Sequence, residues 1–73
     1  MAAVQPTISV TINGKRREVP PGLSIPELLA TLGVDHRLVV VEYNREILDR
    51  AAFPQVQVQA GDNLEVVHFV GGG

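Results

Sequence analysis

The sequence predicts an α+β domain in which one helix packs across one face of a mixed sheet. Three observations predict this fold class: a strictly alternating strand that runs into an Asn-Gly turn, a capped amphipathic segment after it, and two further strand-like segments in the second half. An exposed apolar face of a sheet must be covered, and one helix is the smallest element that covers it. Seventy-three residues leave room for one such domain.

The first two predicted strands form a hairpin. In "TISVTIN" Ile8, Val10 and Ile12 point to one face and the hydroxyl side chains to the other, as in a half-buried strand. Asn13-Gly14 is the pair that most readily supplies the two positive φ angles of a tight hairpin turn. The return strand "KRREV" (15–19) is mostly polar, so we expect it at a sheet edge, where lysine and arginine discourage unwanted pairing.

The helix is predicted within "SIPELLATLG" (24–33) and has two to three turns. Ser24 and Glu27 have the spacing of a capping box, in which each side chain bonds the backbone N–H of the other residue. Gly33 is placed to close the helix in a left-handed cap. Residues at i, i+3, i+4 and i+7 form one apolar stripe: Ile25, Leu28, Leu29 and Leu32.

The second half of the chain supplies the remaining strands. "LVVVEY" (38–43) is apolar on both faces until Glu42 and predicts an inner strand, followed by a turn at Asn44-Arg45 and a short strand at 46–48. "DRAAFP" predicts a single helical turn stopped by Pro54, and "QVQVQ" a weak strand or an extended loop. "LEVVHFV" (64–70) predicts the last strand.

The order strand, strand, helix, strand, short strand, strand fixes a topology. The first and last strands can lie side by side and parallel, because the helix between them acts as a crossover. The arrangement is the β-grasp, or ubiquitin-like, topology, with four to five strands in a mixed sheet. We expect residues 1–70 to form this domain and residues 71–73 to form a flexible C-terminal glycine tail.

Composition and charge exclude several classes of protein. Six basic and eight acidic residues give a net charge of −2, which argues against a nucleic-acid binder. The chain has no cysteine, hence no disulfide and no thiolate metal site. The N-terminus lacks the pattern of a signal peptide, and the longest apolar run, Leu38 to Val41, is far too short to span a membrane. A cytoplasmic protein without membrane contact is expected.

The sequence contains no recognisable catalytic constellation. It has no glycine-rich phosphate loop. His36 and His68 lack the spacing of metal ligands, so a surface role or a helix-end role is expected for each. Asp49 and Asp62 lie beside turn residues, where bonds to the local backbone are expected. We therefore expect neither an enzyme, nor a metal site, nor a bound cofactor.

The three glycines at the end of the sequence, Gly71, Gly72 and Gly73, are the remaining candidate site. Glycine has no Cβ, so the narrow cleft of another protein can close around such a segment, and the Gly73 carboxylate could be activated as an acyl-adenylate. The four residues from Val70 to Gly73 reach at most about 13–14 Å when extended. The alternative is an inert, frayed terminus.

The last strand adds a candidate docking surface beside this tail. Leu64 and Val66 continue the buried parity of the strand, whereas Val67 and Phe69 fall on the opposite parity with little in the sequence to cover them. With Val70 next to the tail, this uncovered apolar pair predicts a partner-binding surface. The alternative is a strand buried on both faces.

The ordered set of these segments resembles the ThiS family, the sulfur-carrier proteins of thiamine biosynthesis. The matching residues are "INGK", "GLSIPELLATLGV", "YNREIL", "AGDNLEVV" and the final "VGGG", which together cover nearly the whole chain. One departure is Arg45, where the central turn of the family usually has glycine. Since a type I′ turn disfavours arginine at positive φ, the turn type is left open by the sequence.

The resemblance implies a protein co-substrate. In the family a ThiF-type, ATP-dependent adenylating enzyme activates the C-terminal carboxylate, here that of Gly73, and a sulfur donor such as a cysteine desulfurase converts it to a thiocarboxylate. The sulfur is then delivered to a ThiG-type thiazole synthase. Gly72 and Gly73 match the terminal pair of the family.

Other functions remain open from the sequence. The small subunit of molybdopterin synthase and the carriers of tRNA thiolation share the fold and the terminal glycines. A ubiquitin-like modifier would be joined to lysines through Gly73, and a plain β-grasp binding module would have an inert tail.

Overall fold

The computed structural model describes residues 6–69. Its elements follow one another in chain order: β1 (Ile8–Ile12), β2 (Lys15–Val19), α1 (Ile25–Thr31), η1 (His36–Leu38), β3 (Val39–Tyr43), β4 (Glu46–Ile47), η2 (Arg50–Gln55) and β5 (Asn63–His68). The two η elements are short 3₁₀ helices. The predicted order of strands and helix is therefore confirmed.

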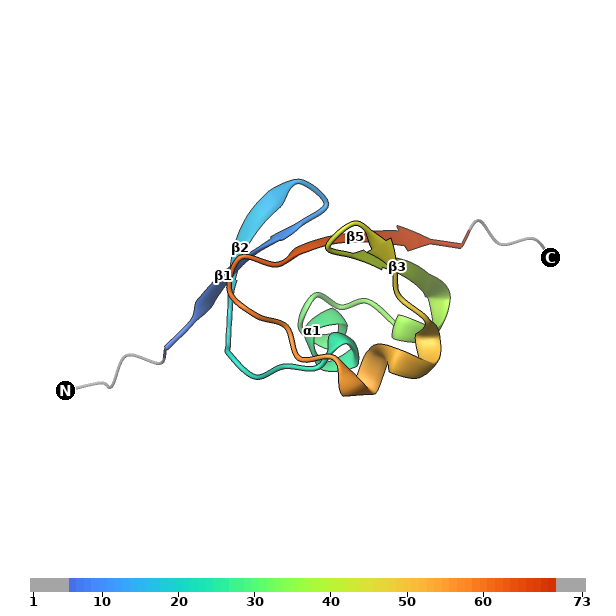
Figure 1. The fold of residues 1–73 in the computed structure, drawn as a ribbon, viewed down its shortest axis with the longest axis horizontal. Helices are drawn as coiled ribbons and strands as arrows, with labels where there is room; N and C mark the ends of the chain where they lie inside the picture. The colour runs from blue at the N-terminus through green and yellow to red at the C-terminus, as the bar shows by residue number, and fades with distance from the viewer. Residues whose placement is uncertain (1–5, 70–73) are drawn as a thin grey trace.

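The five strands form one mixed sheet in the order β2-β1-β5-β3-β4. Strand β5 enters between the two hairpins, parallel to β1 and antiparallel to β3, while β2 lies at an edge. In Figure 1 helix α1 lies on one side of the sheet, and the first and last strands run side by side. The predicted β-grasp topology and the edge position of the second strand are confirmed.

Helix α1 is fixed by its cap and by its apolar stripe. The Ser24 hydroxyl oxygen accepts from the Glu27 N–H at 3.4 Å, and a Glu27 carboxylate oxygen accepts from the Ser24 N–H at 2.9 Å, so the predicted capping box is present. Gly33 ends the helix at φ +74°, the left-handed conformation that glycine adopts without steric cost. Ile25, Leu28 and Leu29 are fully buried against the sheet.

The core lies between the sheet and this helix. Val10 and Ile12 of β1 and Leu64 of β5 face α1, as their alternation predicts. The segment after β4 closes the remaining side, because Phe53 of η2 and Val58 beyond it are both buried. The other face of the sheet has no helix over it in the part of the chain that the structure describes (Figure 1).

One prediction for the second half of the chain is wrong. The segment around Pro54 is a six-residue 3₁₀ helix that continues through Pro54 to Gln55, not a single turn that the proline stops. The fixed φ of proline near −65° agrees with 3₁₀ geometry, so its ring is tolerated there, although it removes one N–H donor. The short strand β4 ends at Ile47, and Leu48 adds one backbone bond to Val41 at 2.9 Å.

Both hairpin turns have two residues at positive φ. Asn13 and Gly14 have φ of +52° and +80°, as predicted. Asn44 and Arg45 have φ of +49° and +71°, so Arg45 occupies the left-handed conformation that glycine would take more readily. The Asn44-Arg45 turn, whose type the sequence does not decide, therefore has two positive φ angles like the Asn13-Gly14 turn.

Candidate functional site

The end of β5 carries the predicted docking residues. Val67 is 60% exposed and Phe69 is 54% exposed, so neither is covered by the rest of the domain. Two more large apolar side chains are exposed on neighbouring segments, Leu38 at the end of η1 and Ile47 in β4. These four residues are called the exposed apolar cluster below: Leu38, Ile47, Val67 and Phe69.

Strand alternation explains why Val67 is uncovered. Val66 packs against the core on the helix side, so Val67 points to the face that has no helix. On that face Val67 lies next to Val40 of β3 in the strand register. The expectation that Val67 is exposed is therefore confirmed, and the alternative of a last strand buried on both faces is excluded.

Leu38 and Ile47 were not predicted as part of this surface. The sequence does contain a sign that Leu38 is exposed. The segment "LVVV" (38–41) is apolar on both faces, although a sheet covered by one helix buries only one of them. Ile47 belongs to a two-residue strand, and its position opposite Glu42 depends on the register of the hairpin. The sequence alone does not give that register when the turn residues are Asn-Arg.

Phe69, the last described residue, is attached to the domain in two ways. Its backbone N–H donates to the Leu38 carbonyl oxygen at 3.0 Å. The guanidinium carbon of Arg50 lies 5.7 Å from the centroid of the Phe69 ring. The same carbon lies 5.7 Å from the centroid of the Phe53 ring. Arg50 is itself held by its bonds to the carbonyl oxygens of His36 (2.6 Å) and Val39 (3.0 Å). The point from which the tail departs is thus tied to η1, β3 and η2.

The other predicted site residues, Val70, Gly71, Gly72 and Gly73, lie outside the described residues. The structure therefore gives the position of the base of the tail and the surface around it. The segment beyond Phe69 has four residues, which reach at most about 14 Å.

Two turn asparagines hold β5 from opposite sides. The side-chain amide of Asn13 pairs with both backbone groups of Val66. The Val66 N–H donates to the Asn13 side-chain oxygen at 2.7 Å, and the Asn13 side-chain nitrogen donates to the Val66 carbonyl oxygen at 3.2 Å. This side chain extends the short parallel ladder between β1 and β5 beyond Ile12. On the other side, the Asn44 oxygen accepts from the N–H of Asn63 at 2.9 Å.

Asp62, just before β5, is the buried acidic residue of the described chain. Its carboxylate accepts from the Gln59 N–H at 2.7 Å, from the Asn44 side-chain nitrogen at 3.2 Å and from the Tyr43 hydroxyl. Burial, followed by the hydrogen bond to Asp62 and the charge of Asp62, raises the pKa of Tyr43 to about 12. Asp62 thus bonds the local backbone, as expected, and also joins the β3–β4 turn to β5.

No further chemical constellation is present in residues 6–69. No group of three or more metal-ligating side chains occurs there. Asp49 accepts from the Ala51 N–H and caps η2, as expected for a turn aspartate. Ser9 accepts from Arg16, and Thr7 donates to Glu18, so both hydroxyl groups have surface partners. Within the same residues, every helix is too short to cross a membrane.

Comparisons with known proteins agree on one family. Residues 10–73 match the model of the ThiS family. The chain is 40% identical over 50 residues to the sulfur carrier protein ThiS of Bacillus subtilis. This match covers 68% of this chain and 76% of that protein. The crystal structure of a thiamine biosynthesis protein (ThiS) from Geobacter metallireducens has a TM-score of 0.79 and 40% sequence identity, covering 90% of this chain and 100% of that chain.

A second group of relatives is much longer. The chain is 44% identical over 66 residues to a thiazole synthase of Paramagnetospirillum magneticum and 35% identical over 66 residues to one of Magnetococcus marinus. Each match covers 90% of this chain and 20% of the relative. This chain thus spans about a fifth of the length of these two thiazole synthases.

Proposed function

Because the chain belongs to the ThiS family, we propose that it is a sulfur carrier of thiamine biosynthesis, a protein co-substrate and not an enzyme. The carboxylate of Gly73 carries the sulfur. One of its oxygens attacks the α-phosphorus of ATP in a ThiF-type adenylating enzyme, which releases pyrophosphate and leaves an acyl-adenylate. The outer sulfur of a persulfide on a donor such as a cysteine desulfurase then displaces AMP at the carbonyl carbon and forms an acyl disulfide, and a second thiol reduces its S–S bond, becoming part of a new disulfide with the donor sulfur. The product is a thiocarboxylate.

The observation that carries this proposal is the extent of the family match. The match runs from residue 10 to residue 73 and therefore includes Gly71, Gly72 and Gly73, not only the folded domain. Glycine residues suit the chemistry, because a chain without Cβ atoms passes through a narrow cleft and leaves the acyl carbon open to a nucleophile. The folded part contributes a fixed base for this segment at Phe69.

The exposed apolar cluster is the surface by which partner enzymes hold the domain. Val67 and Phe69, with Val70 next to them, lie closest to the tail along the chain, so a partner that contacts them also receives the glycines. All four side chains adjoin β3, because Leu38 precedes it, Ile47 and Val67 are on strands paired with it, and Phe69 bonds Leu38. Exposed apolar side chains grouped in this way are typical of a protein–protein interface. No more than about 14 Å of chain then separates Phe69 from the reacting carboxylate.

Thiazole synthase is the proposed acceptor of the sulfur, and the cytoplasm, which supplies ATP, is the proposed compartment. Two proteins named thiazole synthase contain a segment similar to 90% of this chain. In those proteins a similar domain and the rest of the synthase share one polypeptide, which supports a direct encounter between carrier and synthase here.

The chemistry is tested by intact mass spectrometry of the protein with Gly73 as its last residue. After incubation with the adenylating enzyme, ATP and a sulfur source, we expect the mass change for one oxygen replaced by sulfur. A variant that lacks Gly73 keeps the folded domain and is the matched control, and it should show no change. An unchanged mass of the full chain with a competent partner would exclude the carrier function. Conjugates of higher mass would instead indicate a modifier.

The docking surface is tested by binding of the adenylating enzyme or the synthase to Phe69→Ala. We expect binding to weaken by about tenfold or more, as for an aromatic residue in an interface. Arg16→Gln is the control, because Arg16 lies in edge strand β2, two strands away from β5 in the sheet. Equal losses in the two variants, or unfolding of Phe69→Ala, would contradict the assignment.

A further inference from the structure

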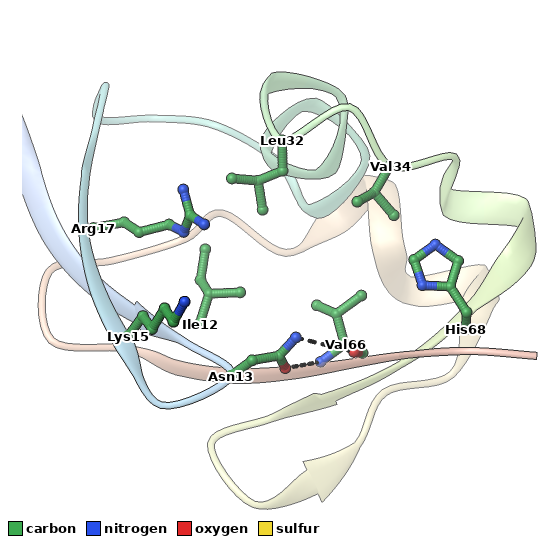
Figure 2. A pocket seen from close by; sticks show the side chains of 8 residues that line it. All are labelled: Ile12, Asn13, Lys15, Arg17, Leu32, Val34, Val66 and His68. Atoms are coloured by element: carbon green, nitrogen blue, oxygen red, sulfur yellow. Dashed lines mark hydrogen bonds between the residues drawn. The ribbon is translucent and has the colours of Figure 1, made fainter.

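A pocket of about 270 Å³ opens on the helix side of the sheet, on the opposite face from Val67. Figure 2 shows it between the β1–β2 hairpin, the C-terminal end of α1 and the last part of β5. None of the four residues of the exposed apolar cluster lines it. Its lining consists of Ile12, Asn13, Lys15, Arg17, Leu32, Val34, Val66 and His68.

The floor and roof of the pocket are apolar and fixed. Ile12 is buried, and Leu32, Val34 and Val66 are partly buried and packed against the core, so contacts within the fold hold all four side chains in place. The paired hydrogen bonds between the Asn13 amide and the backbone of Val66 hold two sides of the pocket together (Figure 2). The cavity is therefore preformed in the folded domain.

One wall is cationic. Successive side chains of β2 point to opposite faces of the sheet. Lys15 and Arg17 therefore lie on the helix side, whereas Arg16, between them, bonds Ser9 on the other face. In Figure 2 both side chains extend toward the space below Leu32, and His68 lies across from them. The ion pair found within residues 6–69 joins Arg37 to Asp35, and neither Lys15 nor Arg17 takes part in it.

This wall stands out because the protein as a whole is acidic, with a net charge of −2. Two cations side by side repel each other, and an anion placed between them relieves that repulsion and accepts hydrogen bonds from both. Arginine and lysine are also the side chains that bind phosphate and carboxylate groups most often. A few polar donors at the rim of an apolar cavity are typical of small-molecule sites.

We propose that this pocket binds a small organic anion, in which a phosphate or carboxylate group is joined to a short apolar body. The oxyanion lies against Lys15 and Arg17, and the apolar body lies between Leu32, Val34 and Val66. His68 closes the far side and can donate a further hydrogen bond. The volume of about 270 Å³ is just below the usual range for drug-sized ligands, so the ligand is a small one.

The test is a titration of the ¹⁵N-labelled protein, in a buffer without phosphate, that follows the backbone amide shifts. The probe is phenyl phosphate, which has both parts of the proposed ligand. Inorganic phosphate and benzyl alcohol each supply one part. We expect saturable shifts at the amides of 13–17 and 66–68 with phenyl phosphate, and binding weaker by about fivefold or more for either part alone.

Variants separate this site from general surface charge. Arg17→Gln and Lys15→Gln should each weaken phenyl phosphate binding by about fivefold, the effect of one lost charge-assisted contact near the surface. Arg16→Gln removes the same charge from the same strand but on the other face, and should leave the affinity unchanged. The proposal is overturned if Arg16→Gln weakens binding as much as Arg17→Gln, if inorganic phosphate binds as tightly as phenyl phosphate, or if no shift saturates. All readouts are of binding, so they do not depend on sulfur transfer.

Discussion

The two hairpin turns of the sheet use the same backbone conformation with different residues. Each begins with an asparagine at positive φ whose side chain bonds the backbone of β5. The second residue is Gly14 in the first turn and Arg45 in the second, at φ of +80° and +71°. A non-glycine residue in this conformation costs roughly 1–2 kcal/mol, so the second turn must be stabilised by something that the first turn lacks.

That stabilisation comes from side chains around the second turn. The Asn13 side chain makes its two hydrogen bonds to one residue of β5, Val66. Asn44 bonds Asn63 and also Asp62, and Asp62 accepts from Tyr43, the residue just before the turn. The second turn is thus enclosed in a network that spans β3, the turn and the start of β5. The comparison indicates that a favourable turn residue and a network of side-chain bonds are alternative ways to hold the same geometry.

The largest effect is expected from Asp62→Ala, which removes the centre of that network. The groups that lose their acceptor are the Gln59 N–H, the Asn44 amide and the Tyr43 hydroxyl. Unpaired polar groups in a partly buried site should lower the free energy of unfolding by about 2–3 kcal/mol. Urea denaturation followed by circular dichroism measures the change. Asp49→Ala is the control, since Asp49 is exposed and accepts one hydrogen bond, from the Ala51 N–H at the start of η2, and its loss should cost about 1 kcal/mol or less.

The second-largest effect is expected when arginine, the second residue of the β3–β4 turn, replaces Gly14 in the β1–β2 turn. Gly14→Arg should lower the free energy of unfolding by about 1–2 kcal/mol, because the first turn has no comparable network to offset the strain of a side chain at φ +80°. A Cβ at Gly14 would meet no atom within 4 Å, so the loss would come from backbone conformation and not from a clash. If the variant is as stable as the parent protein, positive φ is not costly in this hairpin and the comparison fails.

Tyr43 allows the network to be tested by pH. Its pKa is raised to about 12 in the folded protein, whereas an unperturbed tyrosine has a pKa near 10. The folded state therefore holds this proton more tightly, so the contribution is fully present below pH 10 and is lost as the pH rises toward 12. Since Tyr43 is the single tyrosine and the chain has no tryptophan, tyrosinate absorbance follows it directly.

Tyr43→Phe is the matched control for this titration. It should lower the free energy of unfolding by about 1 kcal/mol at neutral pH and remove the part of the alkaline destabilisation that belongs to Tyr43. A tyrosinate titration centred near pH 10 in the folded protein would show that the bond to Asp62 does not hold the hydroxyl proton.

The smallest effect is expected from Arg45→Gly. Relief of the strained φ stabilises the turn, but glycine gains freedom in the unfolded chain, so the net increase in the free energy of unfolding should be only about 0.5 kcal/mol. The same urea titration measures it. A decrease would mean that the Arg45 side chain makes a stabilising contribution larger than the strain that it introduces.

Features set by neighbouring residues in the sequence were predictable. The capping box of Ser24 and Glu27 and the turn at Asn13-Gly14 depend on residues at most three positions apart, and both are confirmed. The parallel pairing of β1 and β5 follows from the helix between them and is also confirmed. The alternation of β5 predicted the exposure of Val67, although the role of that residue in binding remains a proposal.

Features that depend on distant residues could not be predicted. The bonds of Asp62 to Tyr43 and Asn44 join residues 18 or 19 positions apart, and the bonds between Asn13 and Val66 join residues 53 apart. The pocket above β1 brings together β2, α1 and β5, and the sequence showed its cations only as a polar edge strand. Pro54 predicts the end of an α-helical turn, but its fixed φ fits the 3₁₀ helix that forms.

The central place of β5 has a mechanical consequence. A force applied beyond Phe69 acts along a strand that is paired with β1 on one side and with β3 on the other. The bonds to both neighbours run across the strand, so such a pull loads them together in shear, whereas an edge strand such as β2 could be peeled away one bond at a time. The domain can therefore bear tension on its last residues without unravelling from that end.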